Sequence, residues 1–412
     1  LLIKRLQQKT GMSVLFISHD IQLVAEMADR VAVFYRGQMV ESGPVLELMK
    51  APKNPYTRAL LSCRPGLYQP GERLPVVADF MDEGKNQQQG GPELHLHSVQ
   101  GSSKADAQAI SAVEMEKQPQ DFVPRESAGG LIENQRNYKD QSPLLILKNL
   151  NVWYPTAYHF WGQPKAYNKA VQAVTLEVFQ GETLGLVGGS GCGKTTLGRA
   201  VMGLTPIHSG EIWYKGKLLT RAGHKETTAL AREIQMIFQD PYGALNPKIS
   251  IGQAIAETLS VHRLYPRSQI KTEVLRWLDR VGLKPEWYDR YPHEFSGGQR
   301  QRIVIARALA LRPSFVICDE SVSALDVSVQ AQILNLLNEL KAALNFTSIF
   351  ISHDLSVVHY LSDRIAVMNK GKLEEIGIAG QVYRQPASPY TQSLIAAIPK
   401  MPETPSVSAS NI

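Results

Sequence analysis

The chain has 412 residues, of which 43% are hydrophobic and 20% charged, which is typical of a globular protein with room for two or three domains. No apolar run approaches the roughly 18–20 residues that cross a bilayer, and the start LLIKRLQQKT lacks the apolar centre of a secretory signal. Three widely spaced cysteines without a CxxC pair argue against a disulfide framework or a zinc site and favour a reducing cytosol.

Charge is unevenly distributed along the chain. The net charge is +6, but residues 70–143 carry seven basic and twelve acidic side chains, so the remainder stands at +11. A basic remainder suits nucleotide, nucleic acid or an anionic membrane surface equally well. Charge alone therefore selects no ligand.

The beginning of the chain repeats a segment near its end. The pentapeptide FISHD occurs at Phe16–Asp20 and Phe350–Asp354, and Phe16–Leu60 aligns with Phe350–Leu394 without a gap at a constant offset of 334 residues. The opening LLIKRLQ aligns with the middle of an expected helix. Residues 1–68 are therefore expected to be the C-terminal remnant of a first domain whose front lies upstream.

Residues 69–143 are rich in Gln, Gly and Ser and poor in large apolar side chains. Such a segment cannot bury enough surface to offset its ordering entropy, so a flexible linker is predicted. The alternative is a small independent domain, with Leu74–Phe80 as the piece most ready to be ordered.

From residue 144 to 412 apolar strands alternate with helical periodicity, which predicts an α/β domain around a mostly parallel sheet. Strands are expected at 144–152, 173–178, 183–187, 234–238, 315–318, 348–351 and 365–368, and helices at 269–281, 298–311 and 327–344.

A glycine-rich loop follows the expected strand 183–187 and opens a helix. Its pattern, Gly188 and then Gly193-Lys194-Thr195 after four further residues, is that of a P-loop, whose amides and helix N-terminus hold phosphate. Lys194 is expected at the β- and γ-phosphates and Thr195 on Mg²⁺. The residues assigned to the ATP site are Gly188, Gly189, Ser190, Gly191, Cys192, Gly193, Lys194, Thr195 and Thr196.

The strand FVICDE, Phe315–Glu320, ends in two carboxylates. Taken alone, such acids often cap a helix or form an ion pair. Beside a P-loop, Asp319 is expected to hold Mg²⁺ through water and Glu320 to be the general base that activates the attacking water.

The segment FSGGQRQR precedes an apolar helix, and Ser296, Gly297, Gly298 and Gln299 within it have two interpretations. One is a capped helix start with a glycine turn. The other is a resemblance: the four residues are similar to the signature motif of the ATP-binding cassette (ABC) family. The order of P-loop, Gln239, signature, Asp319-Glu320, SALD at Ser323–Asp326 and His353 resembles that family too.

The resemblance implies a P-loop NTPase fold with a RecA-like, mostly parallel core, an antiparallel β subdomain and a helical signature subdomain. It assigns catalytic roles to Glu320, His353 and Gln239, with His353 at the γ-phosphate, and places Thr195, Gln239 and Asp319 on the metal. His19 is the equivalent of His353 in the first cassette.

The same resemblance implies that the signature of one cassette caps the ATP of its partner, so that Ser296–Gln299 serve another P-loop, and that Asp326 lies at the dimer seam. Tyr154 matches the aromatic residue that stacks on adenine. Trp153 is its rival, and packing is an alternative role for both aromatic side chains. This chain departs from the family pattern at two positions. Gly189 stands where relatives usually have an acidic residue, and altered flexibility of the loop is expected from this change. Phe295 stands where Leu is commoner.

Two segments resemble the oligopeptide, dipeptide, nickel and glutathione importer branch: FQDPYGALNP at Phe238–Pro247, and SPYTQSLIAAIP at Ser388–Pro399, mirrored by NPYTRALLSCRP at Asn54–Pro65. That branch implies an ATPase on the cytoplasmic face of the inner membrane, with a second cassette, integral permeases, an external solute-binding protein and no nucleic acid. A tandem-cassette translation factor on ribosomes is the alternative, disfavoured by the acidic linker, because such linkers are typically rich in Lys and Arg. A nucleotide-binding regulator without turnover is disfavoured by Glu320 and His353.

Overall fold

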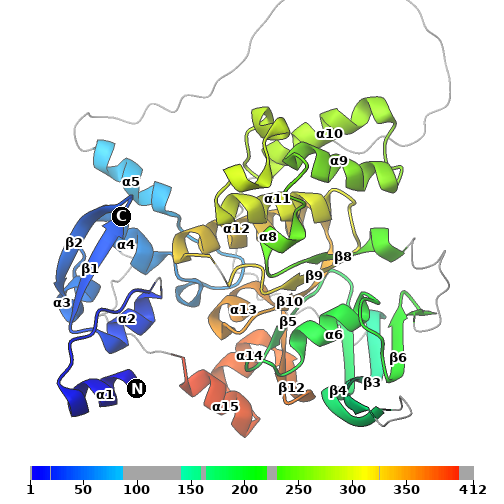
Figure 1. Cartoon of the computed structure of the whole chain (residues 1–412), viewed down its shortest axis with the longest axis horizontal. Helices are drawn as coiled ribbons and strands as arrows, with labels where there is room; N and C mark the ends of the chain where they lie inside the picture. The colour runs from blue at the N-terminus through cyan, green and yellow to red at the C-terminus, as the bar shows by residue number, and fades with distance from the viewer. Residues whose placement is uncertain are drawn as a thin grey trace, which may run out of the picture.

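The computed structural model describes residues 2–18, 20–86, 141–158, 164–219, 230–323 and 325–398 (Figure 1). His19, most of the expected linker and the last residues of the chain lie outside the described residues. Among the helices that are described, none is long and apolar enough to cross a membrane.

A six-stranded sheet forms the centre of the larger domain. Its strand order is β12-β11-β5-β10-β9-β8, and all neighbours are parallel except β12, which runs antiparallel to β11. The bounds are β5 Thr183–Val187, β8 Ile234–Ile237, β9 Phe315–Asp319, β10 Thr347–Ile351, β11 Arg364–Asn369 and β12 Lys372–Ile378. The predicted mostly parallel α/β core is thereby confirmed.

The central strands are buried on both faces because their side chains alternate between two cores. Val316 and Cys318 of β9 face a core shared with the helical part of the domain, whereas Phe315 and Ile317 face one shared with a second sheet. Buried parallel strands of this kind read as continuous apolar runs, as FVIC does here. The sheet is therefore a rigid layer from whose ends loops can project.

The second sheet is antiparallel, with the order β4-β3-β6-β7. Its strands are β3 Pro143–Tyr158, β4 Pro164–Phe179, β6 Ser209–Tyr214 and β7 Lys217–Leu218. β3 and β4 are longer than the sequence predicted, because their ladder continues through the pair Tyr154–Asn168 toward the end of the hairpin. The sheet covers one face of α6, Lys194–Val201, which follows the glycine loop.

A helical group completes the domain. It contains α8 Pro241–Ala244, α9 Ile251–Val261, α10 Arg267–Arg280, η4 Pro285–Asp289, η5 Pro292–Glu294, α11 Gly297–Leu309 and α12 Val327–Leu344. Ser250 and Ser296 begin α9 and α11 with capping boxes. In each, the serine hydroxyl accepts the backbone N–H of a glutamine three residues later, and the side-chain oxygen of that glutamine accepts the serine N–H. α9, α10 and α11 gather above the central sheet in the view of Figure 1, and α6 lies to the right of β5 and β10.

The N-terminal segment folds as a copy of the end of the chain. Its elements are α1 Leu2–Thr10, α2 Ile21–Met27, β1 Arg30–Tyr35, β2 Gln38–Pro44, α3 Val45–Lys50 and α4 Pro55–Ser62; α13 Leu355–Leu361, α14 Ala379–Arg384 and α15 Pro389–Ala396 are the later counterparts of α2, α3 and α4. The β1–β2 register repeats that of β11–β12 at the same offset, including the irregularity at Val33/Phe34 and Val367/Met368.

One part of the copy differs. Thr347–Ile351 is strand β10, but the corresponding segment Ser13–Ile17 forms no strand, and Leu15 and Ile17 are 90% and 87% exposed. β10 is held between β5 and β9. In the described part of the chain no counterparts of those two strands lie beside Ser13–Ile17, so this segment forms no strand-to-strand hydrogen bonds.

The prediction that the linker begins at residue 69 is wrong, because residues 69–86 belong to the folded structure. They hold α5, Val77–Asn86, and the fully buried Leu74. The Asn335 amide on α12 accepts the Leu74 N–H at 2.9 Å and donates to the Leu74 carbonyl at 2.8 Å. The remainder of the predicted linker, 87–140, lies outside the described residues.

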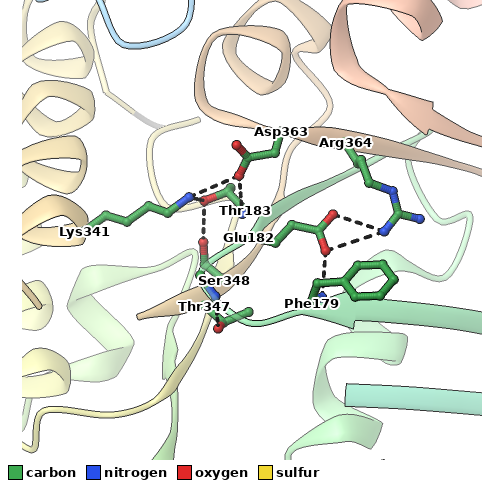
Figure 2. Close-up of polar contacts among 9 residues, drawn as sticks. Phe179, Glu182, Thr183, Lys341, Thr347, Ser348, Asp363 and Arg364 are labelled. Atoms are coloured by element: carbon green, nitrogen blue, oxygen red, sulfur yellow. Dashed lines mark hydrogen bonds and ion pairs between the residues drawn. The ribbon is translucent and has the colours of Figure 1, made fainter. Parts of the chain in front are cut away.

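A polar network supports the turn between β4 and β5, and therefore the strand that leads into the glycine loop (Figure 2). Glu182 is fully buried, accepts the Phe179 N–H at 2.7 Å and pairs with Arg364 at 3.2 Å. Burial raises the pKa of the Glu182 carboxyl above its ordinary 4.5, in spite of these donors. Thr183, Lys341 and Asp363 form the neighbouring part of the network.

The stability of the fold is expected to depend on the ionisation of Glu182. Because its pKa is raised, the folded state binds more protons than the unfolded state at and above pH 4.5, so the free energy of unfolding falls as pH rises through this window. Urea denaturation from pH 4.5 to neutrality should show this slope, and Glu182→Gln should reduce it. Glu177→Gln, an exposed change on β4, should keep the slope; equal slopes in all three proteins would contradict the assignment.

Candidate nucleotide site

Four neighbouring strands end at the same edge of the central sheet, and each delivers one of the predicted segments. β5 leads into the glycine loop, β9 into Asp319 and Glu320, β10 into His353 and β8 into Gln239. The four strands are parallel, so their carboxyl ends meet at one edge. In open α/β sheets this edge is the usual place for a ligand.

The glycine loop is held in a conformation that only glycine supports at two positions. Gly193 has φ +106°, and a Cβ there would lie 2.2 Å from the Ala170 carbonyl oxygen. Gly188 has φ +153°, and its Cβ would lie 2.1 Å from the Met368 carbonyl oxygen. The close approach of β4 and β11 to the loop therefore requires glycine at both ends of the motif.

Lys194, the first residue of α6, is only 5% exposed and folds back over the loop. Its ammonium donates to the carbonyl oxygens of Gly188 at 2.8 Å and Gly189 at 3.1 Å. These contacts hold a positive charge at the N-terminus of the helix, where the backbone N–H groups are also free of intrahelical acceptors. The loop and Lys194 together fit a phosphate group.

The predicted metal position contains oxygen donors suited to Mg²⁺. The Thr195 hydroxyl donates to Asp319 Oδ1 at 2.9 Å, and Asp319 is 2% exposed. Burial raises the pKa of Asp319 above its ordinary value, and the Thr195 hydrogen bond opposes that effect. No group of three His, Cys, Asp or Glu side chains that could hold a metal occurs among the described residues. One carboxylate and one hydroxyl suit a hard ion whose remaining ligands are phosphate and water.

Glu320 is the centre of a second contact set. Gln239 Nε2 donates to its Oε2 at 2.7 Å, and His353 Nδ1 lies 3.7 Å from its Oε1. The Glu320 backbone has φ +43°, with its N–H donating to the Ile351 carbonyl at 2.9 Å. The Glu320 side chain is 17% exposed and that of His353 57% exposed, so water can reach the pair. A carboxylate held in this way can accept a proton from water.

Asp354 fixes the turn that presents His353. It begins α13 by accepting the amide N–H groups of Ser356 at 2.9 Å and Val357 at 3.4 Å. Asp20 makes the same cap on α2 in the N-terminal copy. Within the HD pair, the aspartate caps the following helix, and the histidine lies between that helix and the end of the preceding strand.

The signature residues lie at the start of α11, in the helical group of the domain. Ser296 is exposed at the start of α11, and a Cβ on Gly298 would lie 2.3 Å from Val329 Cγ1, so the glycine permits α11 and α12 to approach. Asp326 caps α12 by accepting the Val329 N–H at 3.0 Å. The structure therefore groups Lys194, Thr195, Asp319, Glu320, Gln239 and His353 at one edge of the central sheet, whereas the signature begins a helix of the helical group.

The two candidate adenine aromatics differ in their surroundings. Trp153 stacks on His208, with ring centroids 3.8 Å apart, and Lys169 lies 4.6 Å from its ring centroid. Tyr154 is 39% exposed at the next position of β3. One ring of Trp153 is thus stacked on a neighbouring side chain, whereas Tyr154 is exposed; its role at adenine stays a prediction.

The sequence missed one residue that touches the loop. The Gly189 N–H donates to the Tyr390 hydroxyl at 3.1 Å, although 201 residues separate the two positions. Tyr390 belongs to the SPYT segment, which the sequence marked as typical of a protein branch. The repetition of PYT was a signal that this tyrosine matters, but it carried no information about its partner.

Alanine at Gly193 is expected to destroy the loop conformation. The added Cβ must displace the Ala170 carbonyl and also strain a left-handed backbone, so we expect a loss of about 2–4 kcal/mol in stability or a loop that no longer binds phosphate. Gly203→Ala is the matched control, since Gly203 has φ +69° with nothing within 4 Å of the new Cβ. Thermal denaturation and nucleotide titration measure both; equal losses in the two variants would contradict the steric argument.

Comparison with known proteins agrees with this geometry. A family model described as ABC transporter matches residues 171–323, and one described as oligopeptide/dipeptide transporter, C-terminal region, matches residues 40–90 and 375–409. The glutathione import ATP-binding protein GsiA of Pectobacterium atrosepticum is 40% identical over 399 residues, and that of Escherichia coli K12 is 41% identical over 404. These alignments cover 97% of this chain and 58% of each relative, so the chain spans little more than half the length of these relatives.

Two solved structures resemble the larger domain. The ATP-binding cassette MJ0796, described as a dimeric post-hydrolysis state bound to ADP and Pi, is 25% identical with a TM-score of 0.51 and covers 57% of this chain and 98% of its own. CbiO1 from Clostridium perfringens, part of the cbiONQ transporter complex, is 28% identical with a TM-score of 0.51, over 59% of this chain and 91% of its own. Residues 171–323 therefore match the ABC transporter family in sequence, the larger domain has the fold of solved ABC cassettes, and residues 40–90 and 375–409 match the oligopeptide/dipeptide transporter C-terminal region.

Proposed function

We propose that this chain binds and hydrolyses MgATP and that its hydrolysis drives the import of a peptide-like solute, with glutathione as the leading member of that class. The observation that carries the proposal is the convergence of four parallel strand ends on one edge, where Lys194, the Thr195–Asp319 pair and the Gln239–Glu320–His353 set lie together. The GsiA relatives supply the solute class.

Each group has a distinct role in this proposal. Lys194 and the loop amides neutralise phosphate charge, and Thr195, Asp319 and Gln239 hold Mg²⁺, which supplies further charge stabilisation when bound. Glu320 takes a proton from the attacking water, while the Gln239 amide and the His353 ring orient its carboxylate. Tyr154 provides a face for the adenine ring.

The proposed site needs a second cassette. The signature Ser296–Gln299 starts α11, whose N-terminus and exposed serine can bind an anion, and Figure 1 shows α11 and α6, the helix that follows the glycine loop, as separate elements of the domain. A head-to-tail pair would bring the signature of each cassette to the ATP of the other, with Asp326 at the seam. Binding that is stronger in the closed pair than in the open one would let ATP shift that equilibrium.

The proposed partners follow from this arrangement. The cassette would lie on the cytoplasmic face of the inner membrane against integral permease subunits, and an external binding protein would deliver the solute. The exposed Tyr242 and Phe238, 64% and 37% exposed beside Gln239, provide an apolar surface close to the site for a permease helix.

Nucleotide-dependent pairing tests the proposal. The purified chain would be compared by light scattering with ATP and EDTA, which blocks metal-dependent hydrolysis, with ADP, and without nucleotide. We expect association only with ATP, and phosphate release when Mg²⁺ is restored. A molecule that binds no ATP, or that releases phosphate at the same rate after Lys194→Ala, would contradict the proposal.

A further inference from the structure

The C-terminal segment makes a direct contact with the glycine loop. Tyr390, in the second position of α15, presents its hydroxyl to the Gly189 N–H at 3.1 Å. Tyr390 is half-buried and packs against the core that the central sheet shares with the helical part of the domain. The contact joins the segment matched by the oligopeptide/dipeptide C-terminal model to the segment that would hold phosphate.

Gly189 is thereby held from two sides. Its carbonyl oxygen accepts the Lys194 ammonium at 3.1 Å and the Cys192 N–H at 3.3 Å, both within the loop. Its N–H points the other way, to Tyr390. The tyrosine thus fixes the orientation of the same residue to which the phosphate-binding lysine is tied.

The hydroxyl of Tyr390 also lies close to the Cα of Gly189. A Cβ on Gly189 would lie 3.3 Å from the Tyr390 hydroxyl oxygen, tighter than an ordinary contact. A larger side chain at residue 189 would require the tyrosine hydroxyl to shift by a few tenths of an ångström. Gly189 and Tyr390 are therefore complementary in shape and in hydrogen bonding.

The tail that carries Tyr390 is anchored to the central sheet by hydrogen bonds. Glu375 on β12 accepts the amide N–H groups of Ala387 at 2.8 Å and Ser388 at 3.0 Å, immediately before α15. β12 pairs with β11, which pairs with β5, and β5 leads into the loop. The anchor therefore belongs to the same sheet as the loop that Tyr390 touches.

The N-terminal copy contains the same anchor. Glu41 accepts the N–H groups of Lys53 at 2.8 Å and Asn54 at 3.1 Å, before α4 and its Tyr56. The anchoring glutamate and the tyrosine therefore recur together at the offset of 334 residues. In both copies, the glutamate therefore fixes the start of the helix that carries the tyrosine.

We infer that Tyr390 is a positioning residue for nucleotide binding: its hydroxyl pre-orders the glycine loop through Gly189 and couples the C-terminal tail to the nucleotide. This inference rests on the proposed function and adds to it a role for the tail. Because coupling is reciprocal, a tail that favours nucleotide binding is itself held more firmly when nucleotide is bound.

Tyr390→Phe in the full chain removes only the hydroxyl. Titration with a fluorescent, non-hydrolysable ATP analogue should show about 3- to 10-fold weaker binding, the effect of one lost neutral hydrogen bond. Tyr383→Phe is the matched control, since Tyr383 lies in the preceding helix and stacks on His359 with ring centroids 4.4 Å apart. It should bind the analogue as the unsubstituted chain does.

A second measurement separates coupling from a merely structural role. Hydrogen exchange in residues 389–396 should slow when the analogue binds to the unsubstituted chain and to Tyr383→Phe, and should not respond in Tyr390→Phe. Equal affinities for Tyr390→Phe and the unsubstituted chain, or equal responses of the tail, would overturn the inference alone. Failure of the unsubstituted chain to bind the analogue would overturn the proposed function as well.

Discussion

Replacing Glu320 by glutamine is expected to lower the rate of phosphate release by about 100- to 10 000-fold, the contribution of a positioned general base. Glutamine keeps the size of the side chain and an oxygen that can still accept from Gln239 Nε2, now 2.7 Å away. It cannot take a proton from water. ATP affinity should therefore change little, and the closed pair should accumulate because bound ATP persists.

Phosphate release under saturating MgATP, measured beside ATP affinity, tests this result. Glu257→Gln makes the same chemical change at an exposed position of α9 and should leave both quantities unaltered. A Glu320→Gln protein that releases phosphate at the unsubstituted rate would remove Glu320 from the catalytic role and revive the interpretation of the strand end as a cap or ion pair.

Replacing Lys194 by alanine is expected to weaken ATP binding by about 100-fold or more. Its ammonium is buried and already directed across the loop, and a charge-assisted hydrogen bond to phosphate contributes roughly 1.5–3 kcal/mol, with two such bonds available. The loss should appear in affinity itself, because the lysine contacts the ligand before any bond is broken.

Equilibrium titration with the non-hydrolysable analogue measures this loss. Lys248→Ala, which removes an exposed ammonium elsewhere on the cassette, is the control for net charge and should bind normally. The two variants should then separate binding from chemistry: we expect Lys194→Ala to lose affinity and Glu320→Gln to keep affinity and lose turnover. Similar affinities for Lys194→Ala and Lys248→Ala would contradict the assignment of the phosphate site.

Much of the site could be predicted because its parts are local. The motif from Gly188 to Thr195 is one contiguous strand–loop–helix, and the helix caps Ser296, Asp326 and Asp354 each act within three residues of themselves. The internal repeat likewise predicted that α2, α3 and α4 would match α13, α14 and α15. Apolar runs such as Phe315–Cys318 indicated buried parallel strands, since both faces of such strands are covered.

Other features required the tertiary structure. Leu74 meets Asn335 across 261 residues, so a segment expected in the linker became part of the core. The stacking of Trp153 on His208 joins residues from two separate segments, so the different surroundings of Trp153 and Tyr154 also appeared only in the tertiary structure.

The sequence by itself determined the local shape of the loop and the identities of the polar residues at the strand ends, because these depend on backbone geometry and side-chain chemistry within short segments. Only the tertiary structure decided which of them meet, including the 3.1 Å contact of Tyr390 with Gly189. Strand order determines such contacts, and it results from the packing of the whole sheet and its two cores rather than from any one segment.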